Sequence, residues 1–175
     1  EATMLTKHCS HTTPEGRKFA MRIMDDLNAH IKKWRKETNI GFALYGTPAE
    51  NLTNLFCKID KARFGSIPDV TDKGYYTNSY HVDVREPINV FDKFSFEADF
   101  EDKSTGGCIS YAEIPNMTHN IPAVLTMVQY IYDHITYGEF NTKLDYCHEC
   151  GFDGEIILND DKLDELHKKT FELAQ

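Results

Sequence analysis

Residues 40–50 read Ile40-Gly41-Phe42-Ala43-Leu44-Tyr45-Gly46-Thr47-Pro48-Ala49-Glu50, and this segment indicates the fold class more clearly than any other. Its first six residues form a short apolar run that is typical of a buried strand. Thr47, Pro48 and Glu50 then supply a helix start: a hydroxyl N-cap, a proline at the first helical position and the glutamate of a capping box. The segment predicts a strand, a tight turn and a helix.

Helix and strand patterns alternate on both sides of this segment. Periodic apolar residues predict helices over residues 14–36 and 121–135. Alternating apolar and polar residues predict strands over residues 80–84 and 108–114, and Pro87 begins a further helical stretch. Such an order is typical of an α/β fold.

Caps and apolar stripes refine these helices. Thr12 and Thr13 offer hydroxyl caps for the first long helix, and Asn120 caps the last one. The residues expected on the apolar stripes of the later helices are Leu52, Leu55, Phe56 and Ile59, then Ile88, Phe91 and Phe94, and finally Val124, Val128, Ile131 and Ile135.

Composition limits the class of protein. The chain has 175 residues, of which 41% are hydrophobic, which suits one domain or part of a larger one. Residues 1–64 carry 11 basic and 7 acidic side chains, whereas residues 65–175 carry 8 and 21. The acidic second part argues against a nucleic-acid partner, which needs clustered lysine and arginine. No apolar run approaches the roughly 18–20 residues that span a bilayer, so no membrane partner is expected.

The five cysteines do not form the dense, even framework of a secreted disulfide scaffold. Cys9, Cys57 and Cys108 are scattered among helix and strand patterns. A reducing, cytoplasmic location is therefore expected. The first residues, Glu1-Ala2-Thr3-Met4, lack the basic and apolar regions of a signal peptide.

The turn from Gly46 through Thr47, Pro48 and Ala49 to Glu50 is the best candidate anion site. A helix start presents backbone N–H groups and the positive end of the helix dipole, and Gly46 lets a ligand approach the backbone. Any well-capped junction between a strand and a helix has the same pattern, so an ordinary structural turn is the alternative.

The run Tyr75-Tyr76-Thr77-Asn78-Ser79-Tyr80-His81 gathers hydroxyls, an amide and an imidazole. Such groups can line a polar substrate pocket, with Asn78, Ser79 and His81 as candidates. The alternative is a loop that leads into a strand, with His81 on the polar face.

Tyr146-Cys147-His148-Glu149-Cys150-Gly151 has the spacing of half a zinc knuckle. A closed zinc site needs four ligands, and no cysteine follows Cys150 in this sequence. A redox dithiol and a pair of free thiols are the alternatives. The glycine-rich turn after Cys150 does not suit the redox reading, because a reactive cysteine favours a helix N-terminus.

Read together, these motifs resemble the large subunit of anaerobic (class III) ribonucleoside-triphosphate reductase. The resemblance covers residues 14–158. The segments that carry it are Tyr45 to Glu50, Phe64-Gly65, Val70 to Val82, Val84 to Glu86, Gly106-Gly107 with Ile109 to Tyr111, and Asp145 to Gly151.

The resemblance implies a glycyl-radical enzyme that removes the ribose 2′-hydroxyl of ribonucleoside triphosphates, for DNA replication under anaerobic conditions. It implies part of the ten-stranded α/β barrel of the ribonucleotide reductase and pyruvate formate-lyase type. Residues 1–145 would form the partial barrel, 146–158 the first half of a zinc knuckle, and 159–175 a charged helical tail unlike the family.

It also implies zinc on Cys147 and Cys150, and substrate contacts from Gly46 to Glu50 and from Asn78, Ser79 and His81. The implied partners are an iron–sulfur activating enzyme that uses S-adenosylmethionine and a second copy of the subunit. The glycyl-radical segment, the cysteine that carries the thiyl radical and the region that binds ATP and deoxynucleotide effectors have no counterpart in this sequence. The chain alone is therefore expected to be inactive, and a zinc-stabilised nucleotide-binding module is the alternative.

Overall fold

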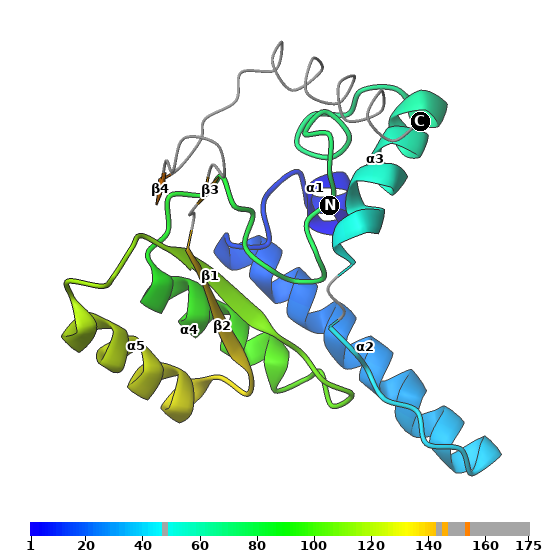
Figure 1. Ribbon diagram of the computed structural model, residues 1–175. Coiled ribbons are helices and arrows are strands. Elements are labelled where there is room, and N and C mark those ends of the chain that lie inside the picture. Colours follow the sequence, from blue (N-terminus) through cyan, green and yellow to red (C-terminus); the bar gives the residue numbers. More distant parts are fainter. Residues whose placement is uncertain (47–48, 143–144, 147–152, 155–175) are drawn as a thin grey trace, which may run out of the picture.

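The computed structural model describes residues 1–46, 49–142, 145–146 and 153–154. In chain order the elements are α1 (Ala2–Lys7), α2 (Pro14–Thr38), α3 (Glu50–Phe64), α4 (Val90–Glu101), β1 (Ser110–Ile114), α5 (Ile121–His134), β2 (Gly138–Thr142), β3 (Asp145–Tyr146) and β4 (Asp153–Gly154). Figure 1 shows α2 running diagonally below α3, with α4 and α5 on the other side of the molecule beside the β1–β2 pair.

The centre of the fold is a βαβ unit. β1 and β2 pair in parallel, from Ser110 opposite Gly138 to Ile114 opposite Thr142, and α5 connects them. Phe94 of α4, Ala112 of β1 and Ile135 after α5 form the buried core beneath this pair. The expected α/β class is therefore confirmed.

The first long helix forms as predicted, and Thr13 is its cap. The Thr13 hydroxyl accepts a hydrogen bond from the Gly16 amide at 3.1 Å. A Cβ atom on Gly16 would lie 2.7 Å from the Ser10 carbonyl carbon and 2.9 Å from His11 Cα. Glycine therefore lets the preceding loop fold tightly back onto α2. The short helix α1, which no pattern predicted, packs against α2.

The strand predicted over residues 40–45 is wrong. This segment has no regular structure, and Ile40 and Tyr45 are more than half exposed. The segment contacts a turn formed by Gly106 and Gly107. The Gly106 amide donates to Leu44 O at 2.6 Å, and the Gly46 amide donates to Gly107 O at 3.0 Å. A tight turn offers too few aligned partners to extend this contact into a ladder.

The strand predicted over residues 80–84 is also wrong, because local and side-chain acceptors take its amides. The His81 amide donates to Asn78 O at 3.0 Å, and the Val82 amide donates to the Glu97 carboxylate at 3.0 Å. The Asp83 carboxylate accepts from the Arg85 amide at 3.0 Å. Tyr80, His81 and Val82 are all buried and Val84 is exposed, so burial along this segment does not alternate as it would in a strand.

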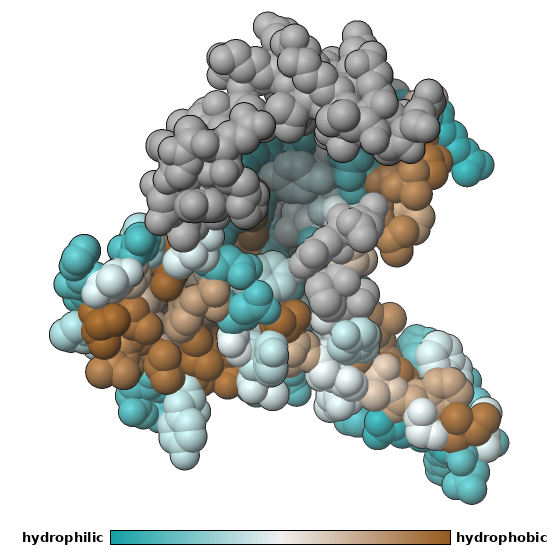
Figure 2. Space-filling model, in the orientation of Figure 1, coloured by the Kyte–Doolittle hydropathy of each residue, from teal (hydrophilic) through white to brown (hydrophobic). Residues whose placement is uncertain are grey.

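The helix faces differ in part from the predicted stripes. On α4, Phe94 is buried as expected, but Phe91 is exposed. On α5, Met127 is buried, as is Ile135 just after the helix, whereas Val128 is 49% exposed. The stripe on α3 forms on the helix but stays about half exposed, whereas Cys57 on the same helix is fully buried. Figure 2 shows apolar surface over α3 and α5.

Candidate functional site

The structure brings the two predicted binding segments together. The Ala49 amide donates to Asn78 Oδ1 at 2.9 Å, and Asn78 Nδ2 donates to the Tyr111 hydroxyl at 3.3 Å. Gly46 lies against the same loop, because a Cβ atom there would be 3.1 Å from Tyr80 Cε1 and 3.5 Å from Ser79 Oγ. One amide side chain thus links the start of α3, residues 78–81 and strand β1.

The start of α3 differs from the predicted capping box. The helix begins at Glu50, and its N-cap residue, Ala49, makes no side-chain cap hydrogen bond. Asn78 instead holds the backbone N–H of the N-cap residue, which the glutamate of a capping box would otherwise bind. Thr47 and Pro48 lie outside the described residues. The Ala49 amide is therefore already paired within the protein.

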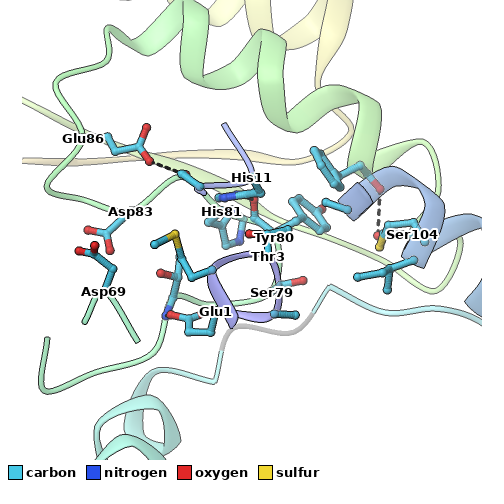
Figure 3. Close-up of a pocket in the computed structure, with 18 of the residues that line it drawn as sticks. Glu1, Thr3, His11, Asp69, Ser79, Tyr80, His81, Asp83, Glu86 and Ser104 are labelled. Atoms are coloured by element: carbon cyan, nitrogen blue, oxygen red, sulfur yellow. Dashed lines mark hydrogen bonds between the residues drawn. The ribbon is translucent and has the colours of Figure 1, made fainter. Parts of the chain in front are cut away.

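Ser79 and His81 line a cavity of about 610 Å³. Ser79 has a φ of 49°, a left-handed conformation that turns the chain at this point. Figure 3 shows His81 and Tyr80 beside His11, above the residues of α1. The His81 ring is buried between Tyr80 and Tyr111, with ring centroids 5.2 and 5.1 Å away.

A fully buried glutamate lies behind His81. Glu97 Oε2 is 3.2 Å from His81 Nδ1, a close electrostatic contact without a linear hydrogen bond, and it accepts from the Ser110 hydroxyl at 2.6 Å. Glu97 Oε1 accepts from the Val82 amide and lies 2.7 Å from Lys93 Nζ. Burial alone would raise the pKa of Glu97, but His81 and Lys93 outweigh it and lower that pKa to about 2.

A second buried ion pair lies along the rim of the cavity. Lys73 Nζ contacts Glu1 Oε1 at 2.8 Å and Asp83 Oδ2 at 3.0 Å, and its side chain is 4% exposed. Asp83 also accepts from Arg85 Nε at 3.0 Å and from the Tyr75 hydroxyl at 2.9 Å. Burial opposes ionisation of Asp83, but the bonds from Arg85, Lys73 and Tyr75 lower its pKa overall.

Sequence reasoning did not identify Glu97, Lys93 or Lys73. Glu97 follows Phe94 by three residues, which places both on one face of α4. This spacing from a core residue indicated that Glu97 could be buried. A pattern of apolar residues alone does not include a charged residue, so Glu97 was not selected. Nothing in the local sequence pairs Lys73 with Glu1, because 72 residues separate them.

The cysteine motif lies almost wholly outside the described residues, and so do Cys147 and Cys150. Its two flanks are described: β3 and β4 pair antiparallel, with Asp145 opposite Gly154 and Tyr146 opposite Asp153. The chain therefore enters and leaves the motif at neighbouring positions. Among the described residues no group of three or more histidine, cysteine or acidic side chains could hold a metal ion.

Comparison with known proteins identifies the family. The family profile for anaerobic ribonucleoside-triphosphate reductase matches residues 1–165, which extends beyond residues 14–158 at both ends. The chain belongs to the anaerobic ribonucleoside-triphosphate reductase family. The anaerobic ribonucleoside-triphosphate reductase of Escherichia coli K12 is 48% identical over 134 residues, and that of bacteriophage T4 is 45% identical over 141 residues.

These reductases are much longer than the present chain. The alignments cover 77% and 81% of this chain but 19% and 23% of the Escherichia coli and phage proteins, so the chain spans about a fifth of their length. It corresponds to a fragment of the large subunit of such an enzyme.

Solved structures support the same fold. An anaerobic ribonucleotide reductase structure matches with a TM-score of 0.67 at 24% identity, over 81% of this chain and 22% of that one. The Thermotoga maritima enzyme in complex with dATP and CTP matches with a TM-score of 0.66 at 18% identity, over 90% and 28%. No helix in the described part of the chain is long and apolar enough to cross a membrane.

Proposed function

We propose that this chain forms part of the catalytic α/β barrel of an anaerobic ribonucleoside-triphosphate reductase. The complete enzyme would convert ribonucleoside triphosphates to 2′-deoxyribonucleotides by glycyl and thiyl radical chemistry in the cytoplasm. Family membership over residues 1–165 supports this proposal, together with the parallel β1–α5–β2 unit, which is the building element of such a barrel.

Within the barrel, Gly46 to Glu50 and Asn78, Ser79 and His81 contact the substrate. The hydrogen bond from the Ala49 amide to Asn78 Oδ1 carries this proposal, because it joins the two segments that the sequence singled out independently. The positive end of the α3 dipole favours a phosphate, while the residue 78–81 loop supplies polar side chains toward the cavity. The Ala49 amide donates to Asn78 Oδ1 within the protein, so it is not one of the groups that bind the phosphate.

Cys147 and Cys150 supply two thiolates to a structural zinc ion, which two further thiolates of the complete protein would close. The antiparallel pairing of β3 and β4 supports a tight turn between them, as a zinc knuckle requires. Zinc would stabilise this end of the barrel without taking part in the reaction. An iron–sulfur activating enzyme, a second copy of the subunit and binding of ATP and deoxynucleotide effectors complete the proposal.

Equilibrium binding of CTP to the 175-residue chain tests the substrate site. Asn78→Asp keeps an acceptor for the Ala49 amide but adds a negative charge beside the proposed phosphate site, so CTP affinity should fall about tenfold or more. Asn54→Asp is the control for added charge, because Asn54 is an exposed residue of α3. This change removes only the bond from Asn54 Nδ2 to Gly74 O. Equal CTP affinity of the two variants would contradict the proposed site.

A further inference from the structure

The buried ring of His81 has two nitrogens that the described part of the protein does not satisfy. Its side chain is 5% exposed, and neither Nδ1 nor Nε2 has a hydrogen-bond partner among the described residues. Nδ1 lies 3.2 Å from the Glu97 carboxylate, whereas no acidic side chain in the described part of the chain contacts Nε2. A buried polar atom without a partner is costly, and the ring lines the cavity of about 610 Å³, so Nε2 is the nitrogen left for a polar group on a bound molecule.

The surroundings of Glu97 determine where the imidazole proton lies. A carboxylate only accepts hydrogen bonds, so the charge of Glu97 Oε2, 3.2 Å from Nδ1, favours the tautomer with its hydrogen on Nδ1, although the two atoms form no linear hydrogen bond. In the neutral ring Nε2 is then an acceptor. Glu97 itself is held by the Val82 amide and the Ser110 hydroxyl. The carboxylate is thus fixed by groups other than His81.

We propose that Glu97 is a positioning residue: it holds the proton of His81 on Nδ1, so that Nε2 accepts a hydrogen bond from a ribose hydroxyl of the bound nucleotide. This inference rests on the proposed function, because it takes the ligand to be a ribonucleotide. Lys93 Nζ, 2.7 Å from Glu97 Oε1, offsets the charge of the carboxylate on the side away from His81.

Nitrogen-15 NMR of the histidine rings tests the positioning role without any nucleotide. The sequence has eight histidines, and the His81 signal is assigned by its loss in His81→Gln. In the parent chain the Nδ1–H form of His81 should dominate. In Glu97→Gln, whose side-chain amide can also donate, that form should lose its dominance. A dominant Nε2–H form in the parent overturns the proposal, and so does an unchanged tautomer in folded Glu97→Gln.

Nucleotide binding tests the second half of the inference. The parent should bind CTP about tenfold more tightly than 2′,3′-dideoxy-CTP, which lacks the ribose hydroxyls. Glu97→Gln should reduce that preference to less than about threefold. A shifted tautomer with an unchanged preference overturns the role of His81 toward the ribose. If the parent binds no CTP, the proposed function fails, while the tautomer measurement still decides the role of Glu97.

Glu101→Gln is the matched control. Glu101 is a second buried glutamate on α4, 4% exposed, and its Oε2 accepts from the Thr136 amide at 2.8 Å. This variant should keep both the His81 tautomer and the nucleotide preference of the parent. If Glu97→Gln fails to fold, the tautomer of the parent chain alone still confirms or overturns the positioning role.

Discussion

Replacing Lys73 by methionine should destabilise the protein markedly, because Lys73 is the buried cation between Glu1 and Asp83. Removing one partner from a fully buried ion pair costs about 3–5 kcal/mol. Here both carboxylates keep other donors. Asp83 retains Arg85 and Tyr75, and Glu1 retains the Thr77 amide at 2.7 Å. We therefore expect a loss of about 2–3 kcal/mol in the free energy of unfolding.

Urea unfolding followed by circular dichroism measures this loss, and thermal unfolding should show a midpoint lowered by about 4–12 °C. Lys33→Met is the matched control, because Lys33 and Glu37 form an exposed pair at 3.7 Å on α2. Such a surface pair contributes only about 0–0.5 kcal/mol. If Lys73→Met unfolds at the same urea concentration as Lys33→Met, the buried network does not stabilise the loop at the cavity rim.

Gly16→Ala should destabilise the chain by about 1–3 kcal/mol in urea unfolding, because its Cβ would meet backbone atoms, whereas Gly41→Ala, with nothing within 4 Å, should be neutral or slightly stabilising. The pKa of Glu97 falls from 4.5 to about 2 on folding, so its contribution to the free energy of unfolding should be complete above about pH 4.5 and lost as the pH falls towards 2. A difference in the free energy of unfolding between the parent and Glu97→Gln that does not change between about pH 5 and pH 2 would contradict this. The half-exposed stripes of α3 and α5 should cause self-association, and a clean monomer in light scattering would count against it. Metal analysis of the complete reductase should find zinc, and Cys147→Ser with Cys150→Ser should remove it; equal zinc in both would place the metal elsewhere.

Helices were predictable here because their signals are local. The stripes and caps over residues 14–36 and 121–135 depend on neighbours three or four positions apart, and α2 and α5 form at those places. The segment 108–114 was predictable for a related reason, because its alternation survives in β1. The direction of its pairing with β2 was not, since it depends on residues 28 positions away.

The two missing strands show what a local pattern leaves out. Residues 40–45 and 80–84 have suitable side chains, but a strand also needs a partner backbone in register. The glycine turn at 106–107 offers the first segment only two bonds, and the Glu97 carboxylate and local turns take the amides of the second. Such competition is visible only once the chain has folded.

The candidate site was predictable as two separate segments but not as one site. Turn chemistry singled out Gly46 to Glu50, and the density of polar groups singled out Asn78, Ser79 and His81. The bond between Ala49 and Asn78 could not be inferred from either pattern, because it spans 29 residues of sequence. Glu97 remained hidden because a charged residue on a buried face contradicts the usual distribution of residues.

The single carboxylate of Glu97 also has a consequence for how the site assembles. Its contacts come from three places in the chain: Lys93 on its own helix, His81 and Val82 in the loop, and Ser110 at the start of β1. An intermediate that buries Glu97 before all three have docked must either carry an uncompensated charge or take up a proton, and both are costly at neutral pH. Partly built versions of the site are therefore poorly populated, and loop, helix and strand reach their final places in one cooperative step.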